Sequence, residues 1–220
     1  DRVPERAAVH TSVELAKHFA HQGIAALVNA VLRRLVREHD RINYPDPDKA
    51  PVRYLSVYYS HPEWLVARWV ERWGAEFVEP LLKTNNQPAE LNIRLNPLRA
   101  GAELASELDL EPAGPLPGFF KATNGAELFA SNAYQQGKFQ VQDPNAALAV
   151  ALLDPQPGER LLDLCSAPGG KATQAATAMQ DRGLVVAADI SLSRLGRVRE
   201  NAQRLGLKTL HPIVRDGTDP

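Results

Sequence analysis

The chain has 220 residues, of which 44% are hydrophobic and 23% are charged, and its formal net charge is −1. This composition is typical of a globular protein, contains no apolar run of membrane-spanning length, and creates no overall positive field that would attract nucleic acid, so an RNA partner would need local basic patches. A single Cys excludes an internal disulfide and a cysteine-rich zinc site, and the six His show no ligand spacing, so we expect a cytoplasmic protein without a metal.

The start of the chain has the pattern of two helices. We predict the first over residues 5–20 and the second over residues 24–38, where apolar residues recur with the helical period. Three arginines lie off the apolar stripe of the second helix: Arg33, Arg34 and Arg37. A solvated helix face is the simplest interpretation of these arginines, and an RNA-facing patch is the alternative.

The middle of the chain mixes linker composition with short helical patterns. Residues 39–54 contain three prolines among charges, which is typical of a linker. Helices are predicted from residue 62 to 74 and over 76–82, although Pro80 is an obstacle to the continuity of the second. We assign the three tryptophans to the core: Trp64, Trp69 and Trp73.

One strand signal follows these helices. Apolar and polar residues alternate over residues 91–96, which predicts a half-buried strand with Arg94 on its polar face. Residues 101–110 then favour a helix, and residues 113–118 favour a loop. This part of the chain therefore predicts a small α+β segment.

From residue 144 onward, helices and strands alternate. Helices are predicted over 144–153, 170–181 and 191–205, and strands over 160–164, 184–190 and 209–215. Strands that alternate with helices of this length indicate a parallel sheet. The pattern predicts an α/β, Rossmann-like half-sheet of the βαβαβ type, incomplete at its C-terminal end.

Residues 161–174, Leu-Leu-Asp-Leu-Cys-Ser-Ala-Pro-Gly-Gly-Lys-Ala-Thr-Gln, are the most informative stretch of the sequence. A strand runs into a turn that opens a helix, where Gly169 and Gly170 let the backbone approach a ligand and Pro168 stiffens the turn. The helix that follows offers unpaired N–H groups to a polar ligand. Such a loop at the carboxyl end of a parallel strand is typical of a nucleotide-type cofactor site. It matches neither the dinucleotide fingerprint nor the P-loop.

Two acids and one lysine are further candidates at this site. Asp189 ends the second strand of the half-sheet, where an acid can bind both ribose hydroxyls, and a helix-capping role is the alternative. Asp216 follows the third strand, and the alternative for it is an ordinary turn aspartate before a glycine. Lys171 near a helix N-terminus suggests an anion nearby, and an exposed lysine without a ligand is the alternative.

The stretch from Asp163 to Lys171 resembles the S-adenosylmethionine-binding loop of the RNA cytosine-5 methyltransferases, the NOL1/NOP2/Sun family. That family's signature reads Asp-x-Cys-Ala-Ala-Pro-Gly-Gly-Lys, and here Ser166 replaces an Ala. Residues 137–146 match the family motif Gly-x-Phe-x-Val-Gln-Asp-x-x-[Ser/Ala]. The first 35 residues resemble the last helices of a NusB-like RNA-binding domain, and residues 86–96 resemble the family's Arg-x-Asn strand in a small RNA-facing subdomain. The combination resembles the bacterial Sun/Fmu (RsmB) type of this family.

The resemblance implies S-adenosylmethionine as cofactor and 16S ribosomal RNA as substrate. The residues implied to bind the cofactor are Cys165, Ser166, Ala167, Pro168, Gly169, Gly170, Lys171, Asp189 and Asp216, the last toward the adenine amino group. Contacts with RNA are implied for Arg33, Arg34, Arg37 and Arg94. The reaction implied is methyl transfer to cytosine C5 after a thiolate adds to C6.

The resemblance also divides the chain, into a NusB-like part over 1–40, linker helices with the small subdomain over 41–136, and a methyltransferase domain over 137–220. In the family the nucleophilic thiol comes from motifs later than any residue here, so no catalytic residue is assigned, and Cys165 is expected to pack under the loop as a small apolar side chain. The chain begins without Met and ends after the third predicted strand. We therefore expect a fragment of a monomeric enzyme, inactive by itself.

Two other functions stay open. The chain could come from a different S-adenosylmethionine-dependent RNA or protein methyltransferase built on the same sheet. It could also be a non-catalytic RNA-binding module with a degenerate cofactor fold. An intact loop together with Asp189 and Asp216 argues against degeneration.

Overall fold

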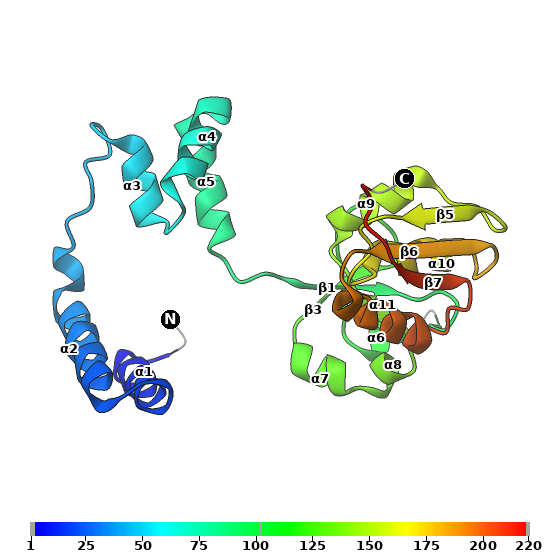
Figure 1. Ribbon diagram of the computed structural model, residues 1–220, viewed down its shortest axis with the longest axis horizontal. Coiled ribbons are helices and arrows are strands. Elements are labelled where there is room, and N and C mark those ends of the chain that lie inside the picture. Colours follow the sequence, from blue (N-terminus) through cyan, green and yellow to red (C-terminus); the bar gives the residue numbers. More distant parts are fainter. Residues whose placement is uncertain (1–2, 102, 219–220) are drawn as a thin grey trace. The chain divides into compact units, whose positions relative to one another are not determined.

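The computed structural model describes residues 3–101 and 103–218 (Figure 1). The chain forms two compact units, Asp1–Pro88 and Ala89–Pro220. The described part of the first unit is helical, and both sheets belong to the second unit. Within the described residues, no helix combines the length and the apolar character needed to cross a membrane.

Helices α1 (Glu5–Phe19) and α2 (Gln22–Glu38) form an antiparallel pair, as the helical patterns predict. Among the described residues, α1 buries none of its residues and α2 buries only Ala25. The apolar stripe of α2 is exposed, with Leu27 at 59% and Val31 at 56% of their full exposure. The helical pair is therefore well formed locally, but the described residues bury little of its apolar surface. A short 3-10 turn, His39–Arg41, follows α2.

Helix α3 (Pro51–Tyr58) begins inside the segment predicted to be a linker. Pro51 occupies the first turn of α3, where its missing N–H needs no partner. Helices α4 (Glu63–Trp73) and α5 (Ala75–Asn85) pack with α3 around a small core of Leu55, Val66, Val78 and Leu82. Helix α5 also runs through Pro80, so the predicted helix over 76–82 was too short.

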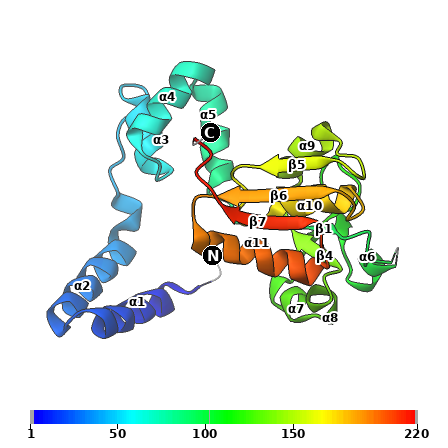
Figure 2. The same ribbon diagram turned by 45° about the vertical axis from the view of Figure 1, so that its right-hand side comes forward.

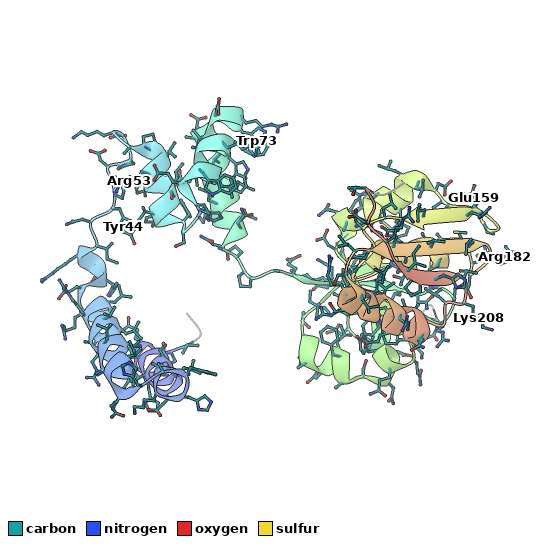
Figure 3. The ribbon with its side chains drawn as sticks, in the orientation of Figure 1. Tyr44, Arg53, Trp73, Glu159, Arg182 and Lys208 are labelled. Atoms are coloured by element: carbon teal, nitrogen blue, oxygen red, sulfur yellow. The ribbon has the colours of Figure 1, made fainter. Side chains whose placement is uncertain are left out.

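The tryptophans do not all lie in this core. Trp69 packs against the α3–α5 cluster, as predicted. Trp64 is 66% exposed and Trp73 is 45% exposed, so the core assignment of these two residues was wrong; Figure 3 labels Trp73 on α4. Nine positions separate these two residues, so they lie on roughly opposite sides of α4.

The second unit begins with an antiparallel sheet in the order β2-β3-β1-β4. Its strands are β1 (Leu91–Leu95), β2 (Glu111–Pro112), β3 (Phe119–Ala122) and β4 (Phe139–Val141). Three short helices accompany it: α6 (Leu104–Glu107), α7 (Gly125–Ala130) and α8 (Asn132–Gln135). Within the helix predicted over 101–110, of which residue 102 lies outside the described residues, α6 is only one turn long. It ends because Asp109 adopts a left-handed φ of 48° and the chain turns into β2. The loop predicted at 113–118 joins β2 to β3, two strands that the sequence did not predict.

Both faces of β1 are covered, which the alternating pattern did not reveal. Ile93 packs in a core with Phe139 and Leu128 on the apolar face. On the opposite face, Arg94 and Asn96 are only 6% and 1% exposed. The prediction of a strand was right, but its polar face lies against other elements of the second unit rather than in solvent.

The rest of the second unit is the parallel half-sheet, and its strands lie side by side in the order β5-β6-β7 (Figures 1 and 2). In chain order its elements are α9 (Pro144–Leu153), β5 (Arg160–Asp163), α10 (Gly170–Ala178), β6 (Leu184–Asp189), α11 (Leu192–Leu205) and β7 (Leu210–Val214). Asp143 caps α9, because its Oδ1 accepts from the N–H groups of Asn145 and Ala146 at 2.7 and 3.1 Å. The predicted order of elements is confirmed.

Helices α10 and α11 cover one face of this half-sheet, and Ala176, Val185 and Val198 belong to the shared core. Side chains on the opposite face are exposed, Leu162 at 59% and Ile213 at 42%. Figure 3 labels Glu159, Arg182 and Lys208, which precede β5, β6 and β7 and mark the amino-terminal edge of the half-sheet. The carboxyl-terminal edge, where the predicted cofactor loop lies, is the other one.

The two sheets are joined by tight contacts at the end of α11. The Asn96 side chain donates from Nδ2 to the carbonyls of Gly137 and Leu205, at 2.9 and 3.0 Å. A side chain at Gly137, where φ is 68°, would lie 1.9 Å from the carbonyl oxygen of Arg204. The domain boundaries proposed from the sequence remain predictions, and the one at residue 137 falls inside this packed region.

Candidate functional site

The loop from Cys165 to Lys171 connects β5 to α10 at the carboxyl edge of the half-sheet. The N–H of Ser166 donates to the carbonyl of Ala188 at the end of β6 (2.9 Å), and the N–H of Gly169 donates back to the carbonyl of Ser166 (2.6 Å). These bonds fold the loop into a tight turn directly before α10. The first-turn N–H groups of α10 then have no partners within the helix, as at every helix start.

The predicted loop residues differ in exposure. Ser166, Ala167 and Gly169 are buried, whereas Pro168 and Lys171 are exposed. The Lys171 side chain is therefore exposed to solvent at the start of α10, the position where we predicted a nearby anion.

Cys165 is exposed, which contradicts its predicted packing beneath the loop. The physical reason is the position of β5, which is an edge strand among the described residues. Its neighbours Leu162 and Leu164 are also exposed, at 59% and 44%. Cys165 thus shares the uncovered side of this edge instead of a core position.

Gly169 is required by the backbone rather than by space for a ligand. Its φ is 100°, a region that side-chain-bearing residues rarely adopt, and an added Cβ would lie 3.3 Å from the Cα of Val198 in α11. At Gly170, by contrast, only the Gln142 side chain would lie near an added Cβ, at 3.8 Å. The close approach at Gly169 is therefore between the loop and α11.

Asp189 lies at the end of β6, facing the loop, and is 3% exposed. Its Oδ1 accepts from the N–H of Ser191 at 3.0 Å and its Oδ2 accepts from the N–H of Ala167 at 3.2 Å. The bond from Ser191 is the main reason that the pKa of Asp189 is lowered, and burial opposes it. Ser191, not Asp189, caps α11, because its hydroxyl accepts from the N–H of Arg194. The alternative helix-capping role of Asp189 is thus taken by its neighbour.

Asp216 lies just beyond β7 and is exposed. Its Oδ1 accepts from the hydroxyl and the N–H of Thr218, at 2.7 and 2.9 Å, and these bonds lower the pKa of Asp216. The adjacent Gly217 lies next to Leu164, the residue after β5. A Cβ atom added at Gly217 would be 3.5 Å from the Cβ of Leu164. The segment after β7 therefore reaches past β6 to the start of the cofactor loop.

Two buried polar atoms at this edge have no hydrogen-bond partner among the described residues: Oγ of Ser166 and Oδ2 of Asp163. Unpaired buried polar atoms cost free energy, so they usually mark a missing partner such as a water or a ligand. The hydroxyl of Ser166 is the very group that distinguishes this loop from the family signature. The polar atoms present at the edge fit a ligand with hydroxyl and amino groups.

The predicted RNA-binding arginines do not form one set. Arg33 and Arg37 line a groove of about 1300 Å³ between α1 and α2, together with Lys17. Arg34 instead points to Glu38, and its Nε lies 2.9 Å from the carboxylate. The structure thus brings two of the three helical arginines together.

Arg94 lies in the second unit and is buried. Its Nε donates to Gln142 (2.8 Å) and its Nη2 donates to the hydroxyl of Thr173 in α10 (3.4 Å). Burial lowers the pKa of Arg94 to about 10. Its role toward RNA stays a prediction, and in this conformation its guanidinium faces α10.

Arg194 belongs to the site but was not predicted from the sequence. Its Nη2 donates to the carbonyl of Ala167 at 3.0 Å, and its Nη1 lies 3.5 Å from Oδ1 of Asp189. Its position five residues after the predicted ribose-binding acid was the only available signal. In the part of the chain that the structure describes, no group of three or more His, Cys, Asp and Glu side chains could hold a metal.

Three segments of the chain match known protein families. A family described as 16S rRNA methyltransferase RsmB/F matches residues 150–220, and a ferredoxin-like domain of RsmF/B-like methyltransferases matches residues 61–109. The NusB family matches residues 1–37. These matches and the fold confirm the predicted fold class, a Rossmann-like half-sheet of the methyltransferase type, and the predicted cofactor, S-adenosylmethionine.

Several proteins are similar to this chain over nearly its whole length. The chain is 35% identical over 222 residues to the probable ribosomal RNA small subunit methyltransferase B of Bacillus subtilis (strain 168), covering 98% of this chain and 49% of the relative. A protein of the same description from Synechocystis sp. is also 35% identical, over 100% of this chain and 50% of the relative. The crystal structure of PH0851 superposes with a TM-score of 0.79 at 26% identity, over 98% of this chain and 49% of that one.

The chain is thus a relative of the Sun/RsmB type of methyltransferases and carries the NusB-like region of that type, which confirms the predicted resemblance. It spans about half the length of the curated relatives that it matches.

Proposed function

We propose that this chain supplies the cofactor-binding and RNA-docking parts of a cytoplasmic methyltransferase that acts on C5 of a cytosine in 16S ribosomal RNA. One observation carries the proposal. Three parallel strands end at one edge, where Asp189 faces the loop and the segment after Asp216 returns to β5. There the buried hydroxyl of Ser166 has no partner among the described residues.

In this proposal each polar group at the edge has a part of the cofactor to bind. The low pKa of Asp189 keeps its carboxylate ionised, so that it can accept hydrogen bonds from ribose hydroxyls in addition to its backbone donors. Asp216, also ionised, accepts from the adenine amino group. Lys171 and the start of α10 attract the carboxylate of the methionine part.

When bound, S-adenosylmethionine supplies an electrophilic methyl group. Cytosine C5 becomes nucleophilic only after a thiolate adds to C6. After methyl transfer, loss of the C5 proton would expel the thiolate from C6 and restore the C5–C6 double bond. We assign the binding and orientation of the cofactor to the described residues and the attacking thiol to a motif outside residues 1–220. Because Cys165 is the only thiol of the chain and is exposed, this assignment can be tested directly.

The helical unit has the RNA-docking role in this proposal. Arg33 and Arg37 would meet phosphates in the α1–α2 groove, in keeping with the match to the NusB family. The printed names of the curated relatives support small-subunit ribosomal RNA as substrate.

The test combines binding and transfer with the 220-residue chain. Calorimetry should detect S-adenosylmethionine binding, and incubation with methyl-labelled S-adenosylmethionine and unmodified 16S rRNA should leave the RNA unlabelled. Absence of cofactor binding would contradict the proposal.

A labelled cytosine C5 that disappears in Cys165→Ala would identify Cys165 as the nucleophile and overturn the assignment of the thiol. Label on another base, or on protein, would favour a different methyltransferase of the same class. RNA binding without cofactor binding would favour the non-catalytic module.

A further inference from the structure

Helix α11 contacts three successive residues of the cofactor loop from one helix face. The Arg194 guanidinium donates to the carbonyl of Ala167 at 3.0 Å, and the Asn201 amide donates to the carbonyl of Pro168 at 3.2 Å. Between them, Val198 lies against Gly169, where an added Cβ would be 3.3 Å from its Cα. Positions 194, 198 and 201 are spaced four and three residues apart and therefore lie on one side of the helix.

These contacts fix the direction of the loop backbone. Two consecutive carbonyls point to α11, and the N–H of Ala167 points to Asp189. Because the carbonyls of Ala167 and Pro168 are bound to α11, they do not face the ligand side of the loop. The loop then continues into α10, whose first-turn N–H groups are unpaired. A loop that could turn its carbonyls toward the ligand would repel the carboxylate of the methionine part.

Arg194 also reaches the acid that we assign to the ribose. Its Nη1 lies 3.5 Å from Oδ1 of Asp189, while its Nη2 binds the loop. The N–H of Ala167 also donates to Oδ2 of Asp189. Ala167, Asp189 and Arg194 therefore each contact the other two. The planar guanidinium donates in two fixed directions, which suits it to hold two acceptors in one relative position.

We propose that Arg194, Val198 and Asn201, called here the loop clamp, are positioning residues that set the cofactor loop in its binding conformation, and that Arg194 also orients Asp189 toward the ribose. This inference rests on the proposed function, because the ligand is S-adenosylmethionine or its product. None of the three residues is assigned a contact with the reacting atoms.

The loop clamp differs from an ordinary surface ion pair in where its effect should appear. The side chain of Arg194 is 58% exposed, and exposed ion pairs contribute little to folding stability. Removal of Arg194 should therefore leave the melting temperature nearly unchanged and act on ligand binding. The two polar members also differ in their partners. Asn201 contacts the loop and Arg204, whereas Arg194 contacts both the loop and Asp189.

The experiment measures affinities of the 220-residue chain for S-adenosylhomocysteine and for its 2′-deoxyribose analogue by calorimetry. The wild-type chain should prefer the ribose form by about tenfold, the effect of a lost hydrogen bond to a charged acceptor. Arg194→Met should weaken S-adenosylhomocysteine binding by roughly tenfold and reduce the preference for ribose. Asn201→Leu should weaken both ligands equally, by about threefold, and leave the preference unchanged. The control is Arg197→Met, an exposed arginine of α11 outside the loop contacts, which should bind like the wild type.

Each outcome addresses a different claim. If the wild-type chain fails to bind S-adenosylhomocysteine, the proposed function fails. If it binds and Arg194→Met keeps both the affinity and the ribose preference, the loop clamp alone is refuted. An equal loss for both ligands in Arg194→Met would keep the contact with the loop but overturn the orientation of Asp189. Melting curves of every variant separate these effects from misfolding.

Discussion

The two units of the chain use polar and apolar residues in opposite ways. In the α1–α2 pair, apolar side chains such as Leu35 are half exposed, and charged residues line the groove. In the second unit, apolar clusters are buried between the helices and one face of each sheet, and polar side chains such as Arg94 and Gln142 are buried against α10, while the other face of the half-sheet is exposed. The second unit therefore has buried cores of its own, whereas the α1–α2 pair relies mainly on local helix contacts.

The largest expected difference between the units is the effect of removing apolar side chains. Phe139→Ala should lower the unfolding free energy of the second unit by about 3–5 kcal/mol, because the ring is fully buried. Leu35→Ala, at a side chain 49% exposed, should change stability by less than about 0.5 kcal/mol. Urea unfolding followed by far-ultraviolet circular dichroism measures both.

The three tryptophans make this test specific, because all of them lie in the first unit. Their fluorescence should report the unfolding of the helical unit and should not follow Phe139→Ala. If the fluorescence transition moves together with the circular dichroism transition, the two units do not unfold independently and the comparison fails.

The next effect concerns the buried acid of the second unit. Asp189→Asn should weaken S-adenosylmethionine binding roughly ten- to hundredfold, because the amide cannot accept as the carboxylate does. Asp216→Asn, at an exposed position, should cost less. Calorimetry checks both, with Glu200→Gln on the exposed side of α11 as the control. An affinity unchanged in Asp189→Asn would remove this residue from the site.

In the helical unit, we expect Arg33 and Arg37 to contribute electrostatically to RNA binding. The double variant Arg33→Gln/Arg37→Gln should flatten the salt dependence of 16S rRNA binding by roughly one unit of slope per lost phosphate contact. Arg34→Gln is the matched control and should leave the slope unchanged, because Arg34 pairs with Glu38. Equal slopes for the wild type and both variants would show that Arg33 and Arg37 form an ordinary solvated helix face.

The smallest expected effect is a pH dependence in the first unit. Burial, with a hydrogen bond to Glu79, raises the pKa of Tyr59 from 10.0 to about 12. Between these two values the unfolded chain has released the proton and the folded chain retains it, so stability falls as the pH rises. Tyr59→Phe should reduce that fall when urea midpoints at pH about 9 and about 11 are compared by tryptophan fluorescence. Tyr58→Phe, at a residue 49% exposed, is the control and should keep the fall.

The strengths and failures of the sequence predictions have physical causes. The βαβαβ order was predictable because long periodic segments and a specific loop set it, whereas β2 and β3 are too short to leave a pattern. The burial of Arg94 was not predictable, because its partners Gln142 and Thr173 lie 48 and 79 residues away. Cys165 was misjudged because β5 was assumed to be buried, although among the described residues it lies at an edge of the sheet. Arg194 was missed because its role depends on which way the loop carbonyls point.

The hydrogen bonds of Asn96 have a consequence for the way the polypeptide is made. This side chain binds the carbonyl of Leu205, which the ribosome adds 109 residues later. At about 5–20 residues per second, that acceptor is synthesised roughly 5–20 seconds after Asn96. During this interval the antiparallel sheet can form its own strand pairs and the Asn96 amide can donate to Gly137, but its second hydrogen bond must be made to water. The junction between the sheets is therefore an event late in translation, and a pause downstream of codon 96 would prolong the exposure of the polar face of β1.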